Sequence, residues 1–516
     1  MSKENSLDNS LKLIAKTSLI VFLGLVISKI CLYAYRVIIA REFGPETYGI
    51  FSLALMILNL FVAIATLGLS DGVSRFIPFY RGKKELSKIK YLFNLSRNIS
   101  LISSIIFAVI LFFTSDFISI NIFHNPNLSI FLKISSIILP FYVLSGIYLS
   151  AIRSFELVGW YSFILNIFQN IIKLIGLIAL VLLGFKSSDI MYSFLIGILV
   201  MFLFSYYIFK IKISRFILGS PDGKSKSLIR TELFKYSLPL MFASVFSIIY
   251  YWIDSFAIGY LNNVTDVGFY NSVVPIALLL NFIPDLFIQM FYPLITKEYS
   301  NKNFKVIGEL SKQVSKWIFI LALPLFFIMF LFPGAVINIL FGSDYLIAAN
   351  TLRILSVGGL ISILTGFLTT LLSMAGKSKT IFLNLLITSG LNLILNLILI
   401  PIYGINGAAI ATTLIWILLT IILFIQVKLA LNLIPLRRKL IRVFLVSLIP
   451  LAVLVFIKSF FEINFIILAS LGILFFILYI ITIILTGCLD KNDKMIIEAF
   501  KQKISYLSTA VYEKFI

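Results

Sequence analysis

The sequence predicts an all-α polytopic membrane protein with about 14 transmembrane helices. Three observations lead to this fold class. The chain of 516 residues is 60% apolar and 13% charged, whereas soluble domains are about 45–50% apolar and about 25% charged. Its apolar stretches are close to the roughly 20 residues that one helical crossing of a bilayer needs. Its basic residues fall mainly on alternate connecting loops, which is the pattern that marks the cytoplasmic side of a membrane protein.

Fourteen apolar stretches predict the individual helices. Each spanning segment must satisfy its own backbone hydrogen bonds, and these lengths suit helices rather than barrel strands. The stretches cover residues 17–40, 47–70, 91–114, 128–152, 160–184, 190–209, 236–260, 268–295, 317–341, 346–374, 380–401, 405–427, 443–457 and 464–487. We expect the first stretch to be retained as a span, because the polar N-terminus is too long for a typical signal peptide.

The positions of lysine and arginine predict the orientation of the chain. With both termini in the cytoplasm, 34 of the 43 basic residues fall on the cytoplasmic side, and only Arg41, Lys186 and Lys458 fall on the outer side. The net charge of +21 is therefore explained by topology and by contact with anionic lipid. Nucleic-acid binding would require a contiguous basic surface and is not expected. The predicted location is the cell (plasma) membrane, as a multi-pass protein.

An internal repeat predicts two parallel six-helix bundles. At an offset of about 219–220 residues, Gly49 falls on Gly268, Phe51 on Tyr270, and LKISS (132–136) on LRILS (352–356). An even number of helices per unit lets both copies insert in the same direction. The predicted parts are an N-lobe (1–209), a cytoplasmic linker (210–235), a C-lobe (236–427), helices thirteen and fourteen (428–487), and a cytoplasmic amphipathic tail (488–516).

The sequence lacks the motifs of a catalyst. The single histidine, His124, and the distant cysteines Cys31 and Cys488 predict neither a metal centre nor a disulfide framework. The segment GSPDGKS (219–225) is one residue short of a phosphate-binding loop and follows no strand. No loop is long enough to hold a catalytic domain. We therefore expect a transporter rather than an enzyme, with no organic cofactor and no catalytic residues.

Charged side chains inside the predicted spans are the candidates for function. Each costs about 2.5–3.5 kcal/mol at the centre of a bilayer, so they cannot all face lipid. Four cations fall in the first bundle and one in the second: Lys29, Arg36, Lys133 and Lys173, then Arg353. Both acids, Asp254 and Asp285, fall in the second bundle. A cationic cavity in the first bundle indicates an anionic substrate. The alternative, that each charge forms a local pair or anchors the chain at the interface, stays open.

Three stretches together carry a family resemblance. They are REFGPETYGIFSLAL (41–55), WIDSFAIGYLNNVTDVGFYNSV (252–273) and the long run at 342–414. With the fourteen spans, they resemble the polysaccharide exporters and lipid-linked oligosaccharide flippases of the multidrug/oligosaccharidyl-lipid/polysaccharide (MOP) superfamily. The resemblance implies two lobes, like those of MATE transporters, that alternate between inward-facing and outward-facing states.

The resemblance also implies a function. The expected flippase moves an oligosaccharide linked to polyprenyl phosphate or diphosphate from the cytoplasmic to the outer leaflet, for cell-surface polysaccharide or glycoprotein synthesis. Its expected partners are this substrate, membrane lipid and the glycosyltransferases of the pathway. The phosphates would be held by the five cations Lys29, Arg36, Lys133, Lys173 and Arg353. A cation-coupled multidrug exporter of the same superfamily and a membrane polysaccharide polymerase stay open as alternatives.

Some relatives bind sodium through their seventh, eleventh and twelfth helices. The positions here that resemble such a site are Asp254, Asn392, Asn396 and Thr412. The resemblance therefore leaves open a coupling ion, either Na⁺ or H⁺.

Overall fold

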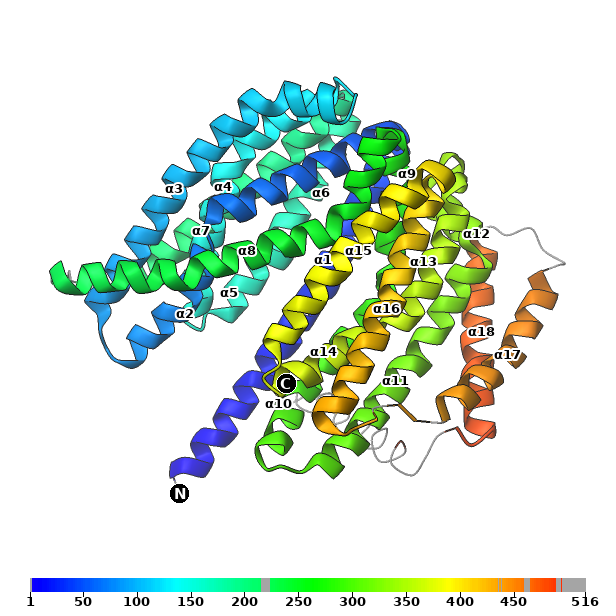
Figure 1. The fold of residues 1–516 in the computed structure, drawn as a ribbon. Coiled ribbons are helices and arrows are strands. Elements are labelled where there is room, and N and C mark those ends of the chain that lie inside the picture. The colour runs from blue at the N-terminus through cyan, green and yellow to red at the C-terminus, as the bar shows by residue number, and fades with distance from the viewer. Residues whose placement is uncertain are drawn as a thin grey trace, which may run out of the picture. The chain divides into compact units, whose positions relative to one another are not determined.

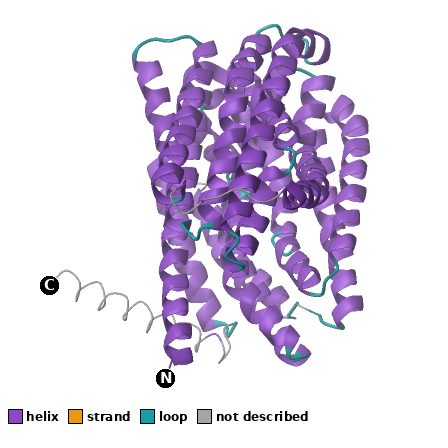
Figure 2. Ribbon diagram, turned by 90° about the vertical axis from the view of Figure 1, so that its left-hand side faces the viewer, coloured by secondary structure: helices purple, strands orange, loops and turns teal. Residues whose placement is uncertain are grey.

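The computed structural model describes residues 2–214, 223–434, 436–437, 439–458, 465–488 and 493. These residues form helices joined by short loops, and no strand occurs among them (Figure 2). The predicted all-α class is confirmed. In this part of the chain, 12 helices are long and apolar enough to cross a membrane. All the predicted apolar stretches fall on helices, while the count of fourteen crossings stays a prediction.

Contacts divide the chain into two compact units, of which the first comprises Met1–Ser272, Leu340–Ile347 and Ser389–Ala411. Its central helix is α4 (Leu128–Ser154), which packs against α1 (Ser2–Thr66), α2 (Leu69–Gly82), α3 (Leu86–Phe117) and α7 (Ile190–Lys212) (Figure 1). The chain between α4 and α7 forms α5 (Val158–Ser162), a π-helical turn (Phe163–Phe168) and α6 (Gln169–Leu182). α6 lies against α7.

The first two predicted spans both lie in α1, which is broken between them at Gly44. This residue has φ 79° and ψ 175°, a conformation that residues with a side chain rarely adopt. Pro45 follows it and cannot donate a backbone hydrogen bond. The predicted loop between the spans is thus a sharp break in a nearly continuous helix. A second break, where Leu67 and Gly68 both have positive φ, separates α1 from the short amphipathic α2.

Helix α8 (Gly223–Leu261) begins inside the predicted linker 210–235. Residues 223–235 therefore extend the helix that was predicted to start at 236, and residues 215–222 lie outside the described part of the chain. Tertiary packing explains the extension. Leu233 is buried, and a Cβ at Gly72 of α2 would come within 2.5 Å of its side chain. α8 packs with the first unit, and the predicted lobe boundaries stay predictions.

The second unit comprises Val273–Ile339, Ala348–Thr388 and Thr412–Ile516. Its central helix is α11 (Phe304–Leu331), which packs against α10 (Leu279–Ser300), α13 (Ala349–Ser362), α17 (Lys439–Lys458) and α18 (Phe465–Leu485). α14 (Thr365–Met374) also belongs to this unit. The residues of four further helices are divided between the two units: α9 (Val264–Ala277), α12 (Pro333–Phe341), α15 (Ser378–Tyr403) and α16 (Ile405–Leu431). The predicted span 317–341 is divided near Pro333, because proline starts a helix well but cannot continue one.

Lys316 precedes the span predicted from 317, and its position was therefore assigned to a cytoplasmic loop. It lies instead on α11, with its ammonium 2.5 Å from Oδ2 of Asp493 and both side chains fully buried. Gln313 also donates to Asp493. A buried charge is tolerated when it is paired, which explains this lysine inside the protein. Of the predicted tail 488–516, only Cys488 and Asp493 belong to the described residues.

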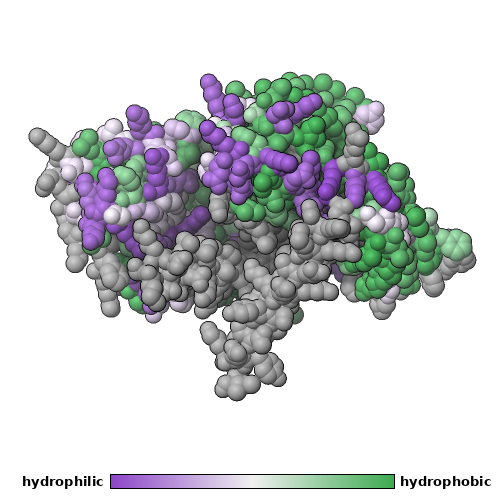
Figure 3. All heavy atoms as spheres, turned by 90° about the horizontal axis from the view of Figure 1, so that it is seen from below, coloured by the Kyte–Doolittle hydropathy of each residue, from purple (hydrophilic) through white to green (hydrophobic). Residues whose placement is uncertain are grey.

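Large apolar side chains cover much of the exposed surface. Phe113 on α3, Leu182 on α6 and Ile473 on α18 are 77%, 81% and 63% exposed. Seen from below, hydrophilic side chains gather in clusters, and hydrophobic ones cover much of the remaining visible surface (Figure 3). Such a surface is unfavourable in water but is suited to contact with hydrocarbon. Together with the long apolar helices, it identifies a multi-pass membrane protein.

Candidate functional site

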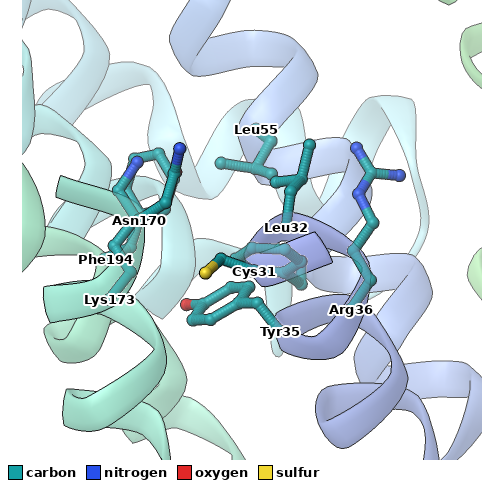
Figure 4. A pocket seen from close by; sticks show the side chains of 9 residues that line it. Cys31, Leu32, Tyr35, Arg36, Leu55, Asn170, Lys173 and Phe194 are labelled. Atoms are coloured by element: carbon teal, nitrogen blue, oxygen red, sulfur yellow. The ribbon is translucent and has the colours of Figure 1, made fainter. Parts of the chain in front are cut away.

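A cavity in the first unit brings together two of the predicted phosphate-binding residues, Arg36 and Lys173. Its volume is about 30 Å³, and its walls are formed by Cys31, Leu32, Tyr35, Arg36, Phe51, Leu55, Asn170, Lys173 and Phe194. Figure 4 shows Lys173 and Asn170 on one side and Arg36 on the other, with Cys31 and Tyr35 between them. Two cations that are distant in sequence therefore line the same cavity.

Lys173 is a buried cation with no acidic partner among the described residues. Its side chain is 8% exposed. The ammonium donates to Oε1 of Gln169 over 3.3 Å and lies 4.0 Å from the centroid of the Phe194 ring. Both partners are neutral, so the positive charge stays uncompensated. Since a buried charge is costly unless it is paired, this site favours an anionic ligand.

Arg36 occupies the opposite wall and also has most of its hydrogen-bonding capacity free. Its Nη1 donates to the hydroxyl of Tyr48 over 3.5 Å, and that hydroxyl donates to the carbonyl of Asn271 over 3.1 Å. A guanidinium carries five N–H donors in a planar fork. One long bond to a neutral hydroxyl therefore leaves this group able to bind a phosphate through two parallel hydrogen bonds.

Hydrogen bonds between helices hold the cavity walls in place. The hydroxyl of Tyr35 on α1 lies 2.8 Å from Oγ of Ser193 on α7. Asn170 on α6 donates to Oγ of Ser28 on α1 over 2.9 Å. On α7, Gly197 leaves room for the stem of Lys173, since a Cβ there would lie 2.2 Å from Cγ of the lysine. The two cations therefore stand on walls that neighbouring polar groups and close packing define.

The other three predicted cations do not line this cavity. Lys29 is exposed on α1. Lys133 on α4 forms an ion pair with Asp116 on α3 at 2.9 Å, which is the local pairing that the sequence left open. Arg353 on α13, in the second unit, donates to the carbonyl of Phe330 and to Oδ1 of Asn350 over 3.1 and 3.0 Å. A role for each of these residues in substrate binding stays a prediction.

Three of the four residues predicted to form a cation site are in contact. Asn392 and Asn396 on α15 donate to Oδ1 of Asp254 on α8 over 3.1 and 2.7 Å. The hydroxyl of Tyr270 on α9 donates to Oδ2 of the same carboxylate over 2.8 Å. All four side chains are buried. The fourth predicted residue, Thr412, is buried on α16 and belongs to the second unit.

The donors of this cluster satisfy a carboxylate rather than surround a cation. Hard cations take several oxygen ligands, but both asparagines turn their amide nitrogens toward Asp254. Oδ1 of Asn396 is buried without a hydrogen-bond partner. Turning the amides over would bring their oxygens against the carboxylate, which is repulsive unless a cation lies between them. In this arrangement the amides bind the carboxylate, and a coupling ion stays a prediction.

Several residues of both sites escaped the sequence analysis, among them Tyr35, Asn170 and Tyr270. Asparagine commonly bridges helices inside membranes, and tyrosine is abundant here with 23 copies, so the residue type alone carries no signal. The internal repeat offers a weak signal in the sequence for one of these residues. Tyr270, which bonds to Asp254, is the predicted equivalent of Phe51, which lines the cavity of Arg36 and Lys173.

Comparison with known proteins identifies the family. The profile of a family described as polysaccharide biosynthesis protein matches residues 14–299, which is more than half of the chain. The chain belongs to the polysaccharide biosynthesis protein family. A second profile, MatE, matches residues 239–398 of this family member. The predicted resemblance to the flippases of the MOP superfamily is thereby confirmed at the level of the family.

Relatives of this polysaccharide biosynthesis family member cover most of its length. An uncharacterized membrane protein of Methanocaldococcus jannaschii is 26% identical over 462 residues, covering 87% of this chain and 91% of the relative. The probable low-salt glycan biosynthesis flippase Agl15 of Haloferax volcanii is 26% identical over 383 residues, covering 73% of this chain and 75% of the relative.

A solved structure supports the fold. The lipid II flippase MurJ in an inward closed conformation superposes with a TM-score of 0.68 at 22% identity, covering 89% of this polysaccharide biosynthesis family member and 98% of MurJ. At this level of identity the likeness concerns the fold alone. The helical architecture is therefore shared between the two proteins.

Proposed function

We propose that this protein is a flippase for a saccharide linked to a polyprenyl phosphate or diphosphate. The observation that carries the proposal is the cavity in which Arg36 and Lys173 stand on opposite walls without an acidic partner among the described residues. A phosphate headgroup supplies the charge that this cavity lacks. Membership of the polysaccharide biosynthesis family and the glycan flippase among the relatives support the saccharide part of the substrate.

The proposed transport runs from the cytoplasmic to the outer leaflet by alternating access, with both termini in the cytoplasm of the cell. The headgroup, with its phosphates and hydroxyls, is expensive to bring into hydrocarbon, so it crosses through a polar cavity while the prenyl tail stays in lipid. The glycosyltransferases that build the saccharide act before this step. The product then serves cell-surface polysaccharide or glycoprotein synthesis.

We further propose that the membrane potential, rather than a coupled cation, drives transport. Moving a negative headgroup outward gains about 2.3 kcal/mol per charge per 100 mV when the inside is negative. The arrangement of Asp254 supports this proposal, since its carboxylate accepts hydrogen bonds from three side chains, which stabilise the ionised form through hydrogen bonding. Transport that continues unchanged after collapse of the potential contradicts this part of the proposal.

An exporter of cationic drugs is the alternative from the same superfamily. The cavity disfavours it, because a positively charged drug would be repelled by Arg36 and Lys173. A polymerase is disfavoured by the short loops that join the helices of the described residues.

Deletion of the gene tests the proposal directly. Loss of a flippase should leave the lipid-linked saccharide in the cytoplasmic leaflet, and a deletion strain without such accumulation would contradict the proposed function. In the complemented strain, Arg36→Gln and Lys173→Gln should reduce export without loss of protein from the membrane. Lys88→Gln is the matched control, because its ammonium is paired with Glu85 at 2.9 Å, does not line the cavity and is not among the five predicted phosphate-binding residues. Full export by both cavity variants would remove these residues from the site.

A further inference from the structure

A second cavity in the first unit lies between α2 and α8. Its volume is about 660 Å³, and its polar lining residues are Asp71, Ser74, Arg75, Tyr236, Ser244 and Ser247. It shares no lining residue with the cavity of Arg36 and Lys173. α2 lies between the second and third predicted spans, on the side that the basic residues assign to the cytoplasm. The groove is therefore on the side where a lipid-linked saccharide would arrive.

Backbone contacts fix the two helices that form this groove. A Cβ at Gly68 would lie 2.0 Å from the carbonyl oxygen of Ser237 on α8. At Gly72 a Cβ would lie 2.5 Å from the side chains of both Leu233 and Ser237. The α2 backbone can approach α8 this closely only because both positions are glycine. The spacing between the walls is thus set by close packing and not by mobile surface side chains.

Arg75 is held in the groove by an aromatic ring and not by an acid. Its guanidinium carbon lies 4.2 Å from the centroid of the Tyr236 ring and 5.5 Å from that of Phe76. Among the described residues it has neither an ion pair nor a hydrogen bond. A guanidinium attracted to an aromatic ring keeps the N–H groups along its edge available. This edge can bind two oxygens of one phosphate.

The remaining lining residues suit a saccharide. The carboxylate of Asp71 and the hydroxyls of the serines can accept hydrogen bonds from sugar hydroxyls. Ser247 already donates its proton to the carbonyl of Ala243 over 2.8 Å, which leaves its oxygen as an acceptor. A phospholipid headgroup without hydroxyls would gain nothing from Asp71 and would be repelled by it. The combination of one free arginine with one carboxylate therefore favours a saccharide phosphate over a simple lipid phosphate.

We propose that the groove between α2 and α8 is a docking site where the phosphate-linked saccharide binds on the cytoplasmic side before it reaches the cavity of Arg36 and Lys173. Arg75 holds a phosphate, and Asp71 accepts hydrogen bonds from the sugar. The proposal rests on the proposed flippase function and adds a separate binding step to it. The volume of the groove, about 660 Å³, lies within the roughly 300–1,000 Å³ of common ligand pockets, which suits a ligand the size of a sugar phosphate.

Binding to the full-length protein in nanodiscs tests the docking site. The probe is polyprenyl diphosphate carrying one N-acetylhexosamine, and the measured quantity is its dissociation constant. Arg75→Gln should weaken binding about tenfold, as expected for the loss of a charge-assisted phosphate contact. Arg81→Gln is the matched control. Arg81 is on the same helix and lies near the Phe155 ring, but it is paired with Glu156 at 3.4 Å and does not line the groove.

A second variant separates the sugar contact from the phosphate contact. Asp71→Asn should weaken binding of the saccharide probe but leave binding of polyprenyl diphosphate without sugar unchanged. Equal binding of the saccharide probe by Arg75→Gln and the wild type overturns the docking site, while the proposed function stands if the wild type still binds and translocates. A wild type that neither binds nor translocates the probe contradicts the function itself. If Arg75→Gln reduces retention of phosphatidic acid, whose headgroup carries no sugar-like hydroxyls, as much as that of the probe, measured by native mass spectrometry, the groove is a general phospholipid site and the proposal fails.

Discussion

Gly49 on α1 and Gly268 on α9 hold these two helices in backbone contact, and an alanine at Gly49 tests how tight that contact is. A Cβ at Gly49 would lie 1.9 Å from the carbonyl oxygen of Val264, and a Cβ at Gly268 would lie 2.0 Å from that of Pro45. Real Cβ atoms essentially never come closer than 3.0 Å. The alanine must therefore move the helices apart by about 1 Å, the difference between 3.0 and 1.9 Å.

The cost of Gly49→Ala follows from two opposing effects. Overpacking typically costs about 1–3 kcal/mol. We expect a cost near the upper end of this range, because the Cβ would meet a backbone carbonyl oxygen, which cannot move aside like a flexible side chain. Alanine regains roughly 1 kcal/mol, because it is a better helix former than glycine. We therefore expect the variant to lose about 2 kcal/mol of folding free energy.

Thermal unfolding of the purified protein in nanodiscs of fixed lipid composition measures this loss. Gly49→Ala should lower the Tm. Gly390→Ala on α15 is the matched control, since no atom lies within 4 Å of its Cβ, and it should keep or raise the Tm. Gly49→Ala combined with Gly268→Ala should cost less than the sum of the single changes, because the first alanine has already separated the helices. A Tm of Gly49→Ala equal to that of the control would refute the packing argument.

Two further outcomes test the acidic side chains. Asp254→Asn should lower the Tm in nanodiscs, because the hydrogen bonds that Asn392 and Asn396 donate lose their charged acceptor, at roughly 1 kcal/mol. Added Na⁺ should leave the wild-type Tm unchanged, and a rise that Asp254→Asn abolishes would identify a cation site instead. For Asp71, burial raises the pKa above its ordinary value of 3.8, and the charge of Arg153 opposes the rise. Its ionised form accepts sugar hydrogen bonds best. Affinity for the saccharide probe should therefore fall as pH drops through that raised pKa, and binding by Asp71→Asn should show no such fall.

The helices could be predicted from the sequence because the length and apolar content of a span are properties of a continuous segment. The breaks between helices depend on the backbone conformation of single residues. Their geometry therefore could not be predicted from the length and apolar content of a segment. Gly44 takes a positive φ before Pro45, which keeps two predicted spans within one interrupted helix. Residues 223–235 are polar enough to be taken for a linker, but packing of Leu233 on Gly72 stabilises them as the first turns of α8.

The candidate site was only partly predictable, for a related reason. The cost of a charge in a membrane selects Arg36, Lys133 and Lys173 equally. Only the fold shows that Lys133 forms an ion pair with Asp116, whereas Arg36 and Lys173 line a cavity. Likewise, Asp254 and Asn392 are 138 residues apart in the chain, and no local pattern reports their contact. Arg75 is one of the 34 basic residues that indicate topology, and its position over the Tyr236 ring depends on how α2 and α8 pack.

The predicted repeat relates the two sites to each other. At the offset of 219 residues that relates Gly49 to Gly268, Tyr35 and Phe51 correspond to Asp254 and Tyr270. The contacts correspond as well. The rings of Tyr35 and Phe51 lie 5.8 Å apart, and the hydroxyl of Tyr270 bonds to Asp254 over 2.8 Å. In the second half a carboxylate of the chain itself is bound, and in the first half no acid is present among the lining residues. We infer that the carboxylate of Asp254 occupies, in the second half of the chain, the place that the substrate phosphate takes in the cavity of the first half.

This equivalence predicts the effect of Tyr35→Asp. The new carboxylate would stand on the wall of the cavity that holds Lys173, in the role that Asp254 has beside Asn392, and would pair with the uncompensated ammonium. Because the cavity would then contain its own anion, binding of the saccharide probe and export should both be lost, while the protein stays folded in the membrane. Tyr35→Asn is the control, since it removes the same ring and the bond to Ser193 without adding charge, and it should retain more binding. Equal binding by the two variants would show that the charge at this position is irrelevant, and the equivalence between Asp254 and the substrate phosphate would then be wrong.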